Sequence, residues 1–262
     1  MRRSLNLALV STLHDPQARL DAALRARVGG LAAYAGVYLT VTDRTPRGVV
    51  ERLQGAGAVV IGGKHDQIGV ARRLALQAAV DGGHEAFFYC DFDRWLHWAG
   101  AYPEELAALP QRLAARRPRP WYVCLGRTAR AFASHPYVQR VAEGATNRTL
   151  SLALGRRLDA TAGSCWLSRE GATLVLRASQ EPTNATDLEW PALVYRAAPR
   201  RLAGLATEGL EFETAEFFAA EVAAAGGEAA WQRAHYERAE VWCARLGLAA
   251  DSVRVATQVL KR

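Results

Sequence analysis

The chain has 262 residues, of which 50% are hydrophobic, 23% charged and 8% aromatic, and it carries a formal net charge of +7. This length suits one large domain, or a nucleotide-binding core with a smaller appendage, and needs neither disulfides nor a structural metal for stability. No run of 18 apolar residues is present, which argues against a transmembrane helix, and the scattered arginines form no nucleic-acid-binding motif.

Arginine supplies nearly all of the positive charge, because Lys64 and Lys261 are the two lysines among 33 basic residues. Guanidinium groups suit phosphate or carboxylate ligands, although many of these arginines would serve equally well on solvated faces. The four cysteines form no CxxC pair, which argues against zinc and favours a cytoplasmic location. We expect no nucleic-acid partner, while peripheral membrane contact and the oligomeric state stay open.

The first 100 residues alternate apolar runs of strand length with segments of helical periodicity. Helices are predicted from Asp15-Pro16 to about residue 34, from Pro46 to about 57, and from Gly69 to about 83. Solidly apolar strands separated by helices indicate an α/β fold, with a parallel sheet covered on both faces. The predicted strands are 5–13, 36–42, 58–63 and 85–90. Ligands bind beyond the carboxyl ends of such strands, which points to the loops at 13–16, 43–46, 62–69 and 91–95.

The pattern is weaker after residue 100. The sequence predicts a helix over 103–118 that Pro110 interrupts, and a strand over 121–126. Residues 145–176 are interpreted as strands and turns followed by a helix from near Ser168. Two further helical regions are predicted, one capped near Thr186 or Asp187 and one from Thr214 to the C-terminus with a break at Gly226-Gly227.

The most informative motif is the pair of aspartates in the segment YCDFDRW. Asp91 and Asp93 close the strand 85–90, and in an extended segment residues i and i+2 project to the same side. Two carboxylates can then converge on a hard cation such as Mg²⁺ or Mn²⁺, which in turn bridges phosphates. The alternative is a solvated strand end. The preceding glycine-opened helix, with Arg72 and Arg73, favours the functional interpretation.

Together these segments resemble the GT-A family of nucleotide-sugar-dependent glycosyltransferases, nearest to family-2-like and mannosylglycerate-synthase-like enzymes. The resemblance rests on a strand ending in His14-Asp15-Pro16, a second ending in VTDRT, the segment GGKHDQIGVARRLALQAAV, and the DFD of 91–93, which is similar to the family's DxD. Two later segments, DATAGSCWLSRE and TDLEW, resemble its acceptor region. The sequence departs from the family in having ARR for ARN, and Asp43-Arg44-Thr45 for Asp-Asp-Gly-Ser.

The resemblance implies a Rossmann-type α/β/α sandwich with a mostly parallel central sheet. It divides the chain into a nucleotide-sugar-binding subdomain (1–120), an acceptor-binding subdomain (121–213) and C-terminal helices (214–262). It also implies a Mn²⁺ or Mg²⁺ cofactor and a nucleoside-diphosphate sugar as donor. The donor-binding residues implied are Thr12, His14, Asp43, Lys64, Arg72, Arg73 and Asp91.

Several of these residues also have a purely structural interpretation. Asp43 could cap the turn before Pro46, and one arginine of the pair could simply be solvated. Lys64 lies in a glycine loop, GGKH, that lacks the spacing of a P-loop.

The candidates for the catalytic base are Asp187 and Glu189, which would deprotonate an acceptor hydroxyl in an inverting reaction. Acidic residues are also common at helix N-termini for electrostatic reasons. His235 is a candidate third metal ligand by resemblance, although a lone helical histidine is more often structural. Trp166 and Trp190 could stack on a sugar or pack in the core.

The leading hypothesis is a metal-dependent hexosyltransferase acting on a hydroxyl acceptor, inverting or retaining. A nucleotidyltransferase of similar fold is an alternative, although LVSTLHDPQ lacks the GxGxR-like signature expected after its first strand. The other alternative is a degenerate, non-catalytic sugar-nucleotide-binding protein.

Overall fold

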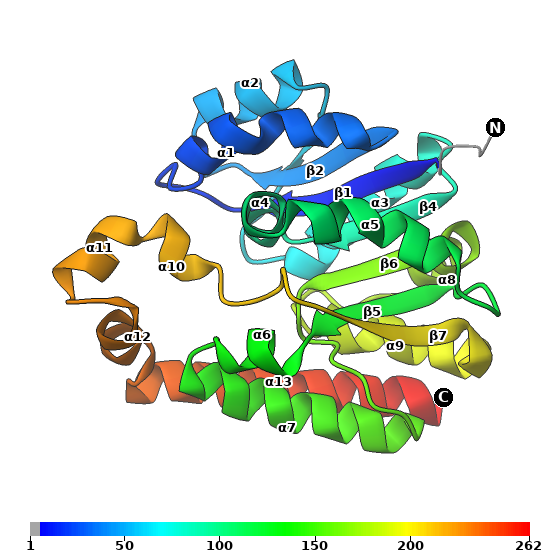
Figure 1. Cartoon of the computed structure of the whole chain (residues 1–262). Coiled ribbons are helices and arrows are strands. Elements are labelled where there is room, and N and C mark those ends of the chain that lie inside the picture. Colours follow the sequence, from blue (N-terminus) through cyan, green and yellow to red (C-terminus); the bar gives the residue numbers. More distant parts are fainter. Residues whose placement is uncertain (1–5) are drawn as a thin grey trace.

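The computed structural model describes residues 6–262, which form a central seven-stranded sheet between two layers of helices (Figure 1). The strand order is β3-β2-β1-β4-β6-β5-β7. The strands are β1 (Leu7–Leu13), β2 (Gly36–Thr42), β3 (Val59–Gly63), β4 (Ala86–Cys90), β5 (Tyr122–Arg127), β6 (Ser164–Ser168) and β7 (Leu202–Thr207).

The helices cover both faces of the sheet and extend beyond it at the C-terminus. They are α1 (Asp21–Arg27), η1 (Val28–Ala33), α2 (Arg47–Gly55), α3 (Ile68–Asp81), α4 (Phe92–Ala101), α5 (Pro103–Ala114), α6 (Ala129–Ala133), α7 (Tyr137–Leu154), α8 (Arg169–Ala178), α9 (Thr186–Ala197), η2 (Pro199–Arg201), α10 (Thr214–Phe217), α11 (Ala219–Ala224), α12 (Glu228–Tyr236) and α13 (Ala239–Lys261). None of the helices within residues 6–262 is long and apolar enough to cross a membrane.

Alternating side chains along each strand divide the core into two layers, as strand geometry requires. On one face, Leu9 and Phe88 pack with the buried side chains of α1, α2, α4 and α5. On the other face, Val10 and Phe87 pack with those of α3, α7, α8, α9 and α13. The fold is thus an α/β/α sandwich, as predicted.

The sheet is mostly parallel, also as predicted. β1 pairs in parallel with β2 and β4, β2 with β3, and β5 with β7. β6 is the exception, because it lies antiparallel between β4 and β5. The predicted strands 5–13, 36–42, 58–63, 85–90 and 121–126 are confirmed within a residue or two, with Leu5 outside the described residues.

Three helix predictions need correction. The first helix begins at Asp21, because the Asp15 carboxylate accepts hydrogen bonds from the Arg19 and Leu20 amides and stabilises a turn there instead. Pro110 lies inside α5 without interrupting it. Residues 145–154, interpreted as strands and turns, belong to α7, whose buried positions recur every four residues at Val138, Ala142, Thr146, Leu150 and Leu154.

Candidate functional site

The carboxyl ends of β1, β2 and β3 form one exposed group of polar loops. His14 follows β1, and its Nδ1 lies 2.8 Å from Thr42 Oγ1 at the end of β2. Thr42 is paired with Gly63, so Asp43 and Lys64 follow these strands side by side. The His14, Asp43 and Lys64 side chains are exposed. An imidazole, a carboxylate and an ammonium group are therefore available to a ligand.

Thr12 and Tyr89 connect this region to the end of β4. The Thr12 Oγ1 lies 3.0 Å from the Tyr89 hydroxyl and donates to Asp91 Oδ1 over 3.4 Å. Tyr89 also donates to the Asp91 carboxylate. Two hydroxyl groups therefore orient Asp91 at the carboxyl end of the sheet.

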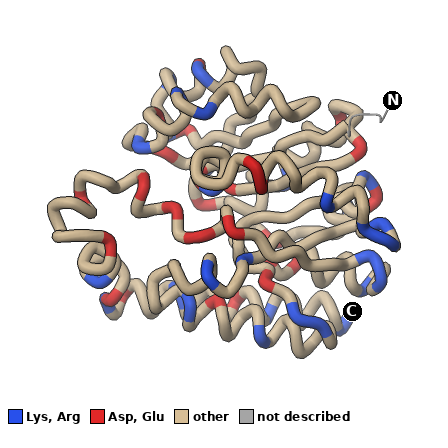
Figure 2. Tube along the Cα trace, viewed as in Figure 1, with Lys and Arg blue, Asp and Glu red and all other residues tan. Residues whose placement is uncertain are grey.

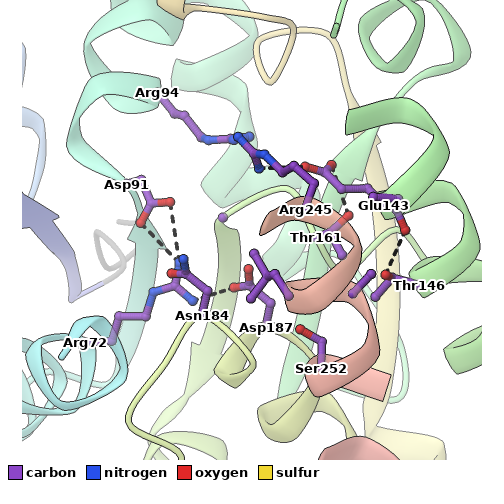
Figure 3. A pocket seen from close by; sticks show the side chains of 14 residues that line it. Arg72, Asp91, Arg94, Glu143, Thr146, Thr161, Asn184, Asp187, Arg245 and Ser252 are labelled. Atoms are coloured by element: carbon purple, nitrogen blue, oxygen red, sulfur yellow. Dashed lines mark hydrogen bonds and ion pairs between the residues drawn. The ribbon is translucent and has the colours of Figure 1, made fainter. Parts of the chain in front are cut away.

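Arg72 of α3 links Asp91 to Asp187 at the start of α9 (Figure 3). Its Nη1 donates to Asp187 Oδ1 over 2.5 Å and to Thr186 Oγ1 over 2.9 Å, while its Nη2 lies 3.4 Å from Asp91 Oδ1. The Arg72 side chain is only 3% exposed, against 25% for Asp91 and 20% for Asp187. Its guanidinium is thus buried behind the two carboxylates rather than offered to solvent.

Asp187 is the more accessible of the two candidate bases. Burial raises the pKa of its carboxyl group to about 6, against the opposing effect of Arg72. A carboxyl group with a pKa near neutrality can both accept and release a proton under ordinary conditions. The geometry therefore suits Asp187 to proton transfer.

Asp93 lies in a second acidic group, which includes a residue that the sequence did not single out. Burial, with the charges of Glu213 and Asp91, raises the pKa of Asp93 to about 7. Glu213 is 5% exposed, its Oε1 lies 3.7 Å from Arg94 Nε, and its Oε2 is buried without a hydrogen-bond partner. Asp91 and Asp93 do not lie on an extended segment as expected, because α4 begins at Phe92.

This acidic group fits a divalent cation in part. A buried carboxylate oxygen without a partner and a carboxyl group with its pKa raised by like charges both mark a place where a cation would be stabilising. The glycine at position 163 leaves room for the Asp91 carboxylate, since a Cβ there would lie 2.3 Å from Asp91 Oδ2. Among the described residues no three His, Cys, Asp or Glu side chains are close enough to hold a metal ion by themselves. An ion here would therefore depend on a phosphate ligand as well.

Five other candidates have different surroundings. His235 is not brought to the aspartates: its ring packs on Trp231 and its Nε2 lies 3.8 Å from Glu221. Glu189 is buried and accepts hydrogen bonds from Ser179 and the amides of residues 180 and 181. Arg73 donates to Ser179 and to the carbonyl of residue 181. Trp166 and Trp190 are 1% and 2% exposed, so both pack in the core.

A cavity of about 120 Å³ opens in front of Asp91 and Asp187. Three residues in its lining come from elements that the sequence did not connect with the site: Arg94 of α4, Glu143 of α7 and Arg245 of α13 (Figure 3). Arg245 lies 3.8 Å from Glu143. Only the position of Arg94 directly after Asp93 could have indicated any of the three.

Comparison with known proteins identifies the fold. No protein-family model matches the chain, and no curated protein matches its sequence. The crystal structure of Mycobacterium tuberculosis glucosyl-3-phosphoglycerate synthase is similar with a TM-score of 0.50 and 13% identity, covering 76% of this chain and 70% of that one. The same synthase in complex with phosphoglyceric acid has a TM-score of 0.51 and 13% identity, covering 76% and 69%. A mycobacterial protein has a TM-score of 0.55 and 11% identity, covering 86% and 76%. The fold is GT-A-like.

Proposed function

We propose that this chain transfers a sugar from a nucleoside-diphosphate sugar to a hydroxyl acceptor, with a divalent cation as cofactor. The observation that carries the proposal is the pair of carboxylates, Asp91 and Asp187, that Arg72 holds together at the carboxyl end of the sheet. A GT-A-like fold, with glucosyl-3-phosphoglycerate synthase among its structural neighbours, supports the same function. As part of this proposal, residues 1–120 bind the nucleotide sugar, residues 121–213 bind the acceptor, and residues 214–262 are C-terminal helices.

The donor would lie across the loops after β1 to β4. His14, Asp43 and Lys64 are exposed there and can bind a nucleoside and its phosphates. Asp91 and Asp93, with Glu213 beside them, would hold Mn²⁺ or Mg²⁺ together with the diphosphate. When bound, the cation would neutralise the negative charge that develops on the departing diphosphate.

The acceptor would enter the cavity in front of Asp187. In an inverting reaction its hydroxyl oxygen forms the new bond to the sugar, the bond to the diphosphate breaks, and the proton passes to Asp187. Arg72 is a positioning residue, because its buried guanidinium orients the Asp187 carboxylate. Glu189 has a structural role, because its carboxylate already caps the loop before α9.

Turnover of candidate donors tests this proposal directly. Uridine, guanosine and adenosine diphosphate sugars would be incubated with Mn²⁺ and small hydroxyl acceptors, and release of nucleoside diphosphate followed by chromatography. We expect release from one donor class, lost in Asp187→Asn and kept in Asp81→Asn, which changes an exposed acid at the far end of α3. Nucleotide binding without any release would support the non-catalytic alternative. Release of pyrophosphate from a nucleoside triphosphate and a sugar phosphate would indicate nucleotidyl transfer instead.

A further inference from the structure

A second and much larger hollow is lined by α7, the loop after it, and the strands β5 and β7. Figure 1 shows where these elements lie. Its volume is about 1100 Å³, against about 120 Å³ for the cavity at Asp91. Small-molecule sites in proteins usually occupy about 300–1,000 Å³. This groove, lined by residues of 124–132, 144–159 and 204–206, therefore has room for a complete organic ligand.

Glycines keep the groove open. Gly144 lies on the wall formed by α7, and a Cβ there would meet only Phe132, at 3.8 Å. On the strands, a Cβ at Gly204 would lie 2.9 Å from Leu158, and one at Gly126 would lie 2.7 Å from Asp159. The loop after α7 can thus approach the sheet closely, and this approach shapes one end of the groove.

The inner end of the groove is polar and already neutralised. The fully buried Arg127 pairs with Asp159 through 2.8 Å contacts and with Glu143 at 2.7 Å. Asn147 donates to Asp159 Oδ1 over 2.7 Å. These groups satisfy one another, so they offer no free charge to a ligand.

The outer part of the groove is different, because it combines free positive charge with an exposed apolar surface. Arg148 and Arg157 are exposed, and within residues 6–262 neither forms an ion pair with an acidic side chain. Basic residues lie along this end of α7 and the loop after it in Figure 2. Leu152, which lies between the two arginines in the sequence, is 64% exposed, and Phe132 in the same lining is partly exposed. An exposed leucine inside a groove favours an apolar ligand.

We propose that this groove binds a single-chain amphipathic anion, with its apolar chain against Leu152 and Phe132 and its phosphate or carboxylate head at Arg148 and Arg157. Guanidinium groups without partners are well suited to both head groups. A neutral chain of the same length would leave the two arginines without a partner, and a short anion would leave Leu152 and Phe132 exposed. The groove adjoins the cavity of the proposed sugar transfer at Glu143, but the binding proposed here uses other residues and does not depend on that reaction.

Calorimetry with defined probes tests the proposal. Dodecyl phosphate and dodecanoate represent the two head groups, and dodecyl maltoside, which has the same chain and no charge, is the comparison; all are used below their micelle concentrations. We expect at least one of the two anions to bind the wild-type chain, and the neutral probe to bind at least about tenfold more weakly. The stronger anion identifies the head group.

Two variants connect the binding to the groove. Arg148→Ala combined with Arg157→Ala should weaken anion binding at least about tenfold, whereas Arg177→Ala combined with Arg233→Ala, which removes equal charge from exposed sites elsewhere, should not. Gly144→Leu should abolish binding by filling the groove and should leave the melting temperature unchanged or higher, because leucine favours a helix more than glycine does. Leu152→Asp, which places a negative charge at an exposed position in the groove, should also abolish anion binding. Equal binding of charged and neutral probes, no binding of either anion, or wild-type affinity in the arginine double variant would overturn the proposal.

Discussion

Arg72 and Asp187 are 115 residues apart in the sequence, yet Arg72 Nη1 donates to Asp187 Oδ1 over 2.5 Å. The contact joins α3, which follows the third strand in the chain, to α9, which follows β6. The same guanidinium also contacts Asp91, so the buried Arg72 side chain orients both carboxylates of the proposed site.

Removing the Arg72 guanidinium should destabilise the fold as well as the site. Arg72→Ala leaves two partly buried carboxylates without their partner, and breaking a buried ion pair in this way costs about 3–5 kcal/mol. We expect a large fall in the free energy of unfolding measured with urea, and almost no change in Arg177→Ala. A stable Arg72→Ala variant would show that Asp91 and Asp187 do not depend on Arg72.

Asp93 should make the stability of the metal-free chain depend on pH. Its pKa is raised to about 7, so the folded state holds a proton that the unfolded chain releases near pH 4. The free energy of unfolding should therefore fall as pH rises from about 4 through 7. Asp93→Asn should remove this contribution and be more stable than the wild type at pH 8 by about 1–2 kcal/mol. If Asp93→Asn is less stable than the wild type at both pH 5 and pH 8, the carboxylate is a stabilising group and this interpretation is wrong.

The two acidic residues at the start of α9 should behave differently from each other. Glu189→Gln weakens the cap of residues 179–181 and should lower stability by about 1.5–3 kcal/mol, with turnover per folded molecule kept. Asp187→Asn should lower turnover at least about a hundredfold, since a positioned base contributes on that scale. Comparing turnover with the folded fraction from circular dichroism separates the two effects, and a Glu189→Gln variant that folds but does not turn over would contradict the assignment.

Much of the sheet could be predicted because its strands are locally distinctive. The apolar runs ending at Leu13, Thr42, Gly63 and Cys90 are short, solid and followed by polar loops, and each forms a strand at nearly the predicted bounds. The helix α7 was missed because its segment NRTLSLAL is rich in Thr, Ser and Leu, and packing under the sheet decides its conformation.

The site was less predictable because most of its contacts join distant segments. The sequence indicated Asp91 and Asp187 separately, but nothing local shows that Arg72 lies between them. Glu213 and Arg245 are brought to the same region by segments that follow the last strand. The extended geometry assumed for Asp91 and Asp93 was wrong, because the chain turns into α4 at Phe92.

The measurement that tests the central claim most directly is calorimetric titration of nucleoside diphosphates with and without Mn²⁺. For uridine, guanosine or adenosine diphosphate, we predict binding to the wild-type chain that strengthens at least about tenfold with Mn²⁺. Asp93→Asn should lose this gain, and Asp81→Asn, at the far end of α3, should keep it. Affinities that are the same with and without Mn²⁺, or no binding of any of the three nucleotides, would contradict a metal-dependent nucleotide-sugar site at Asp91 and Asp93.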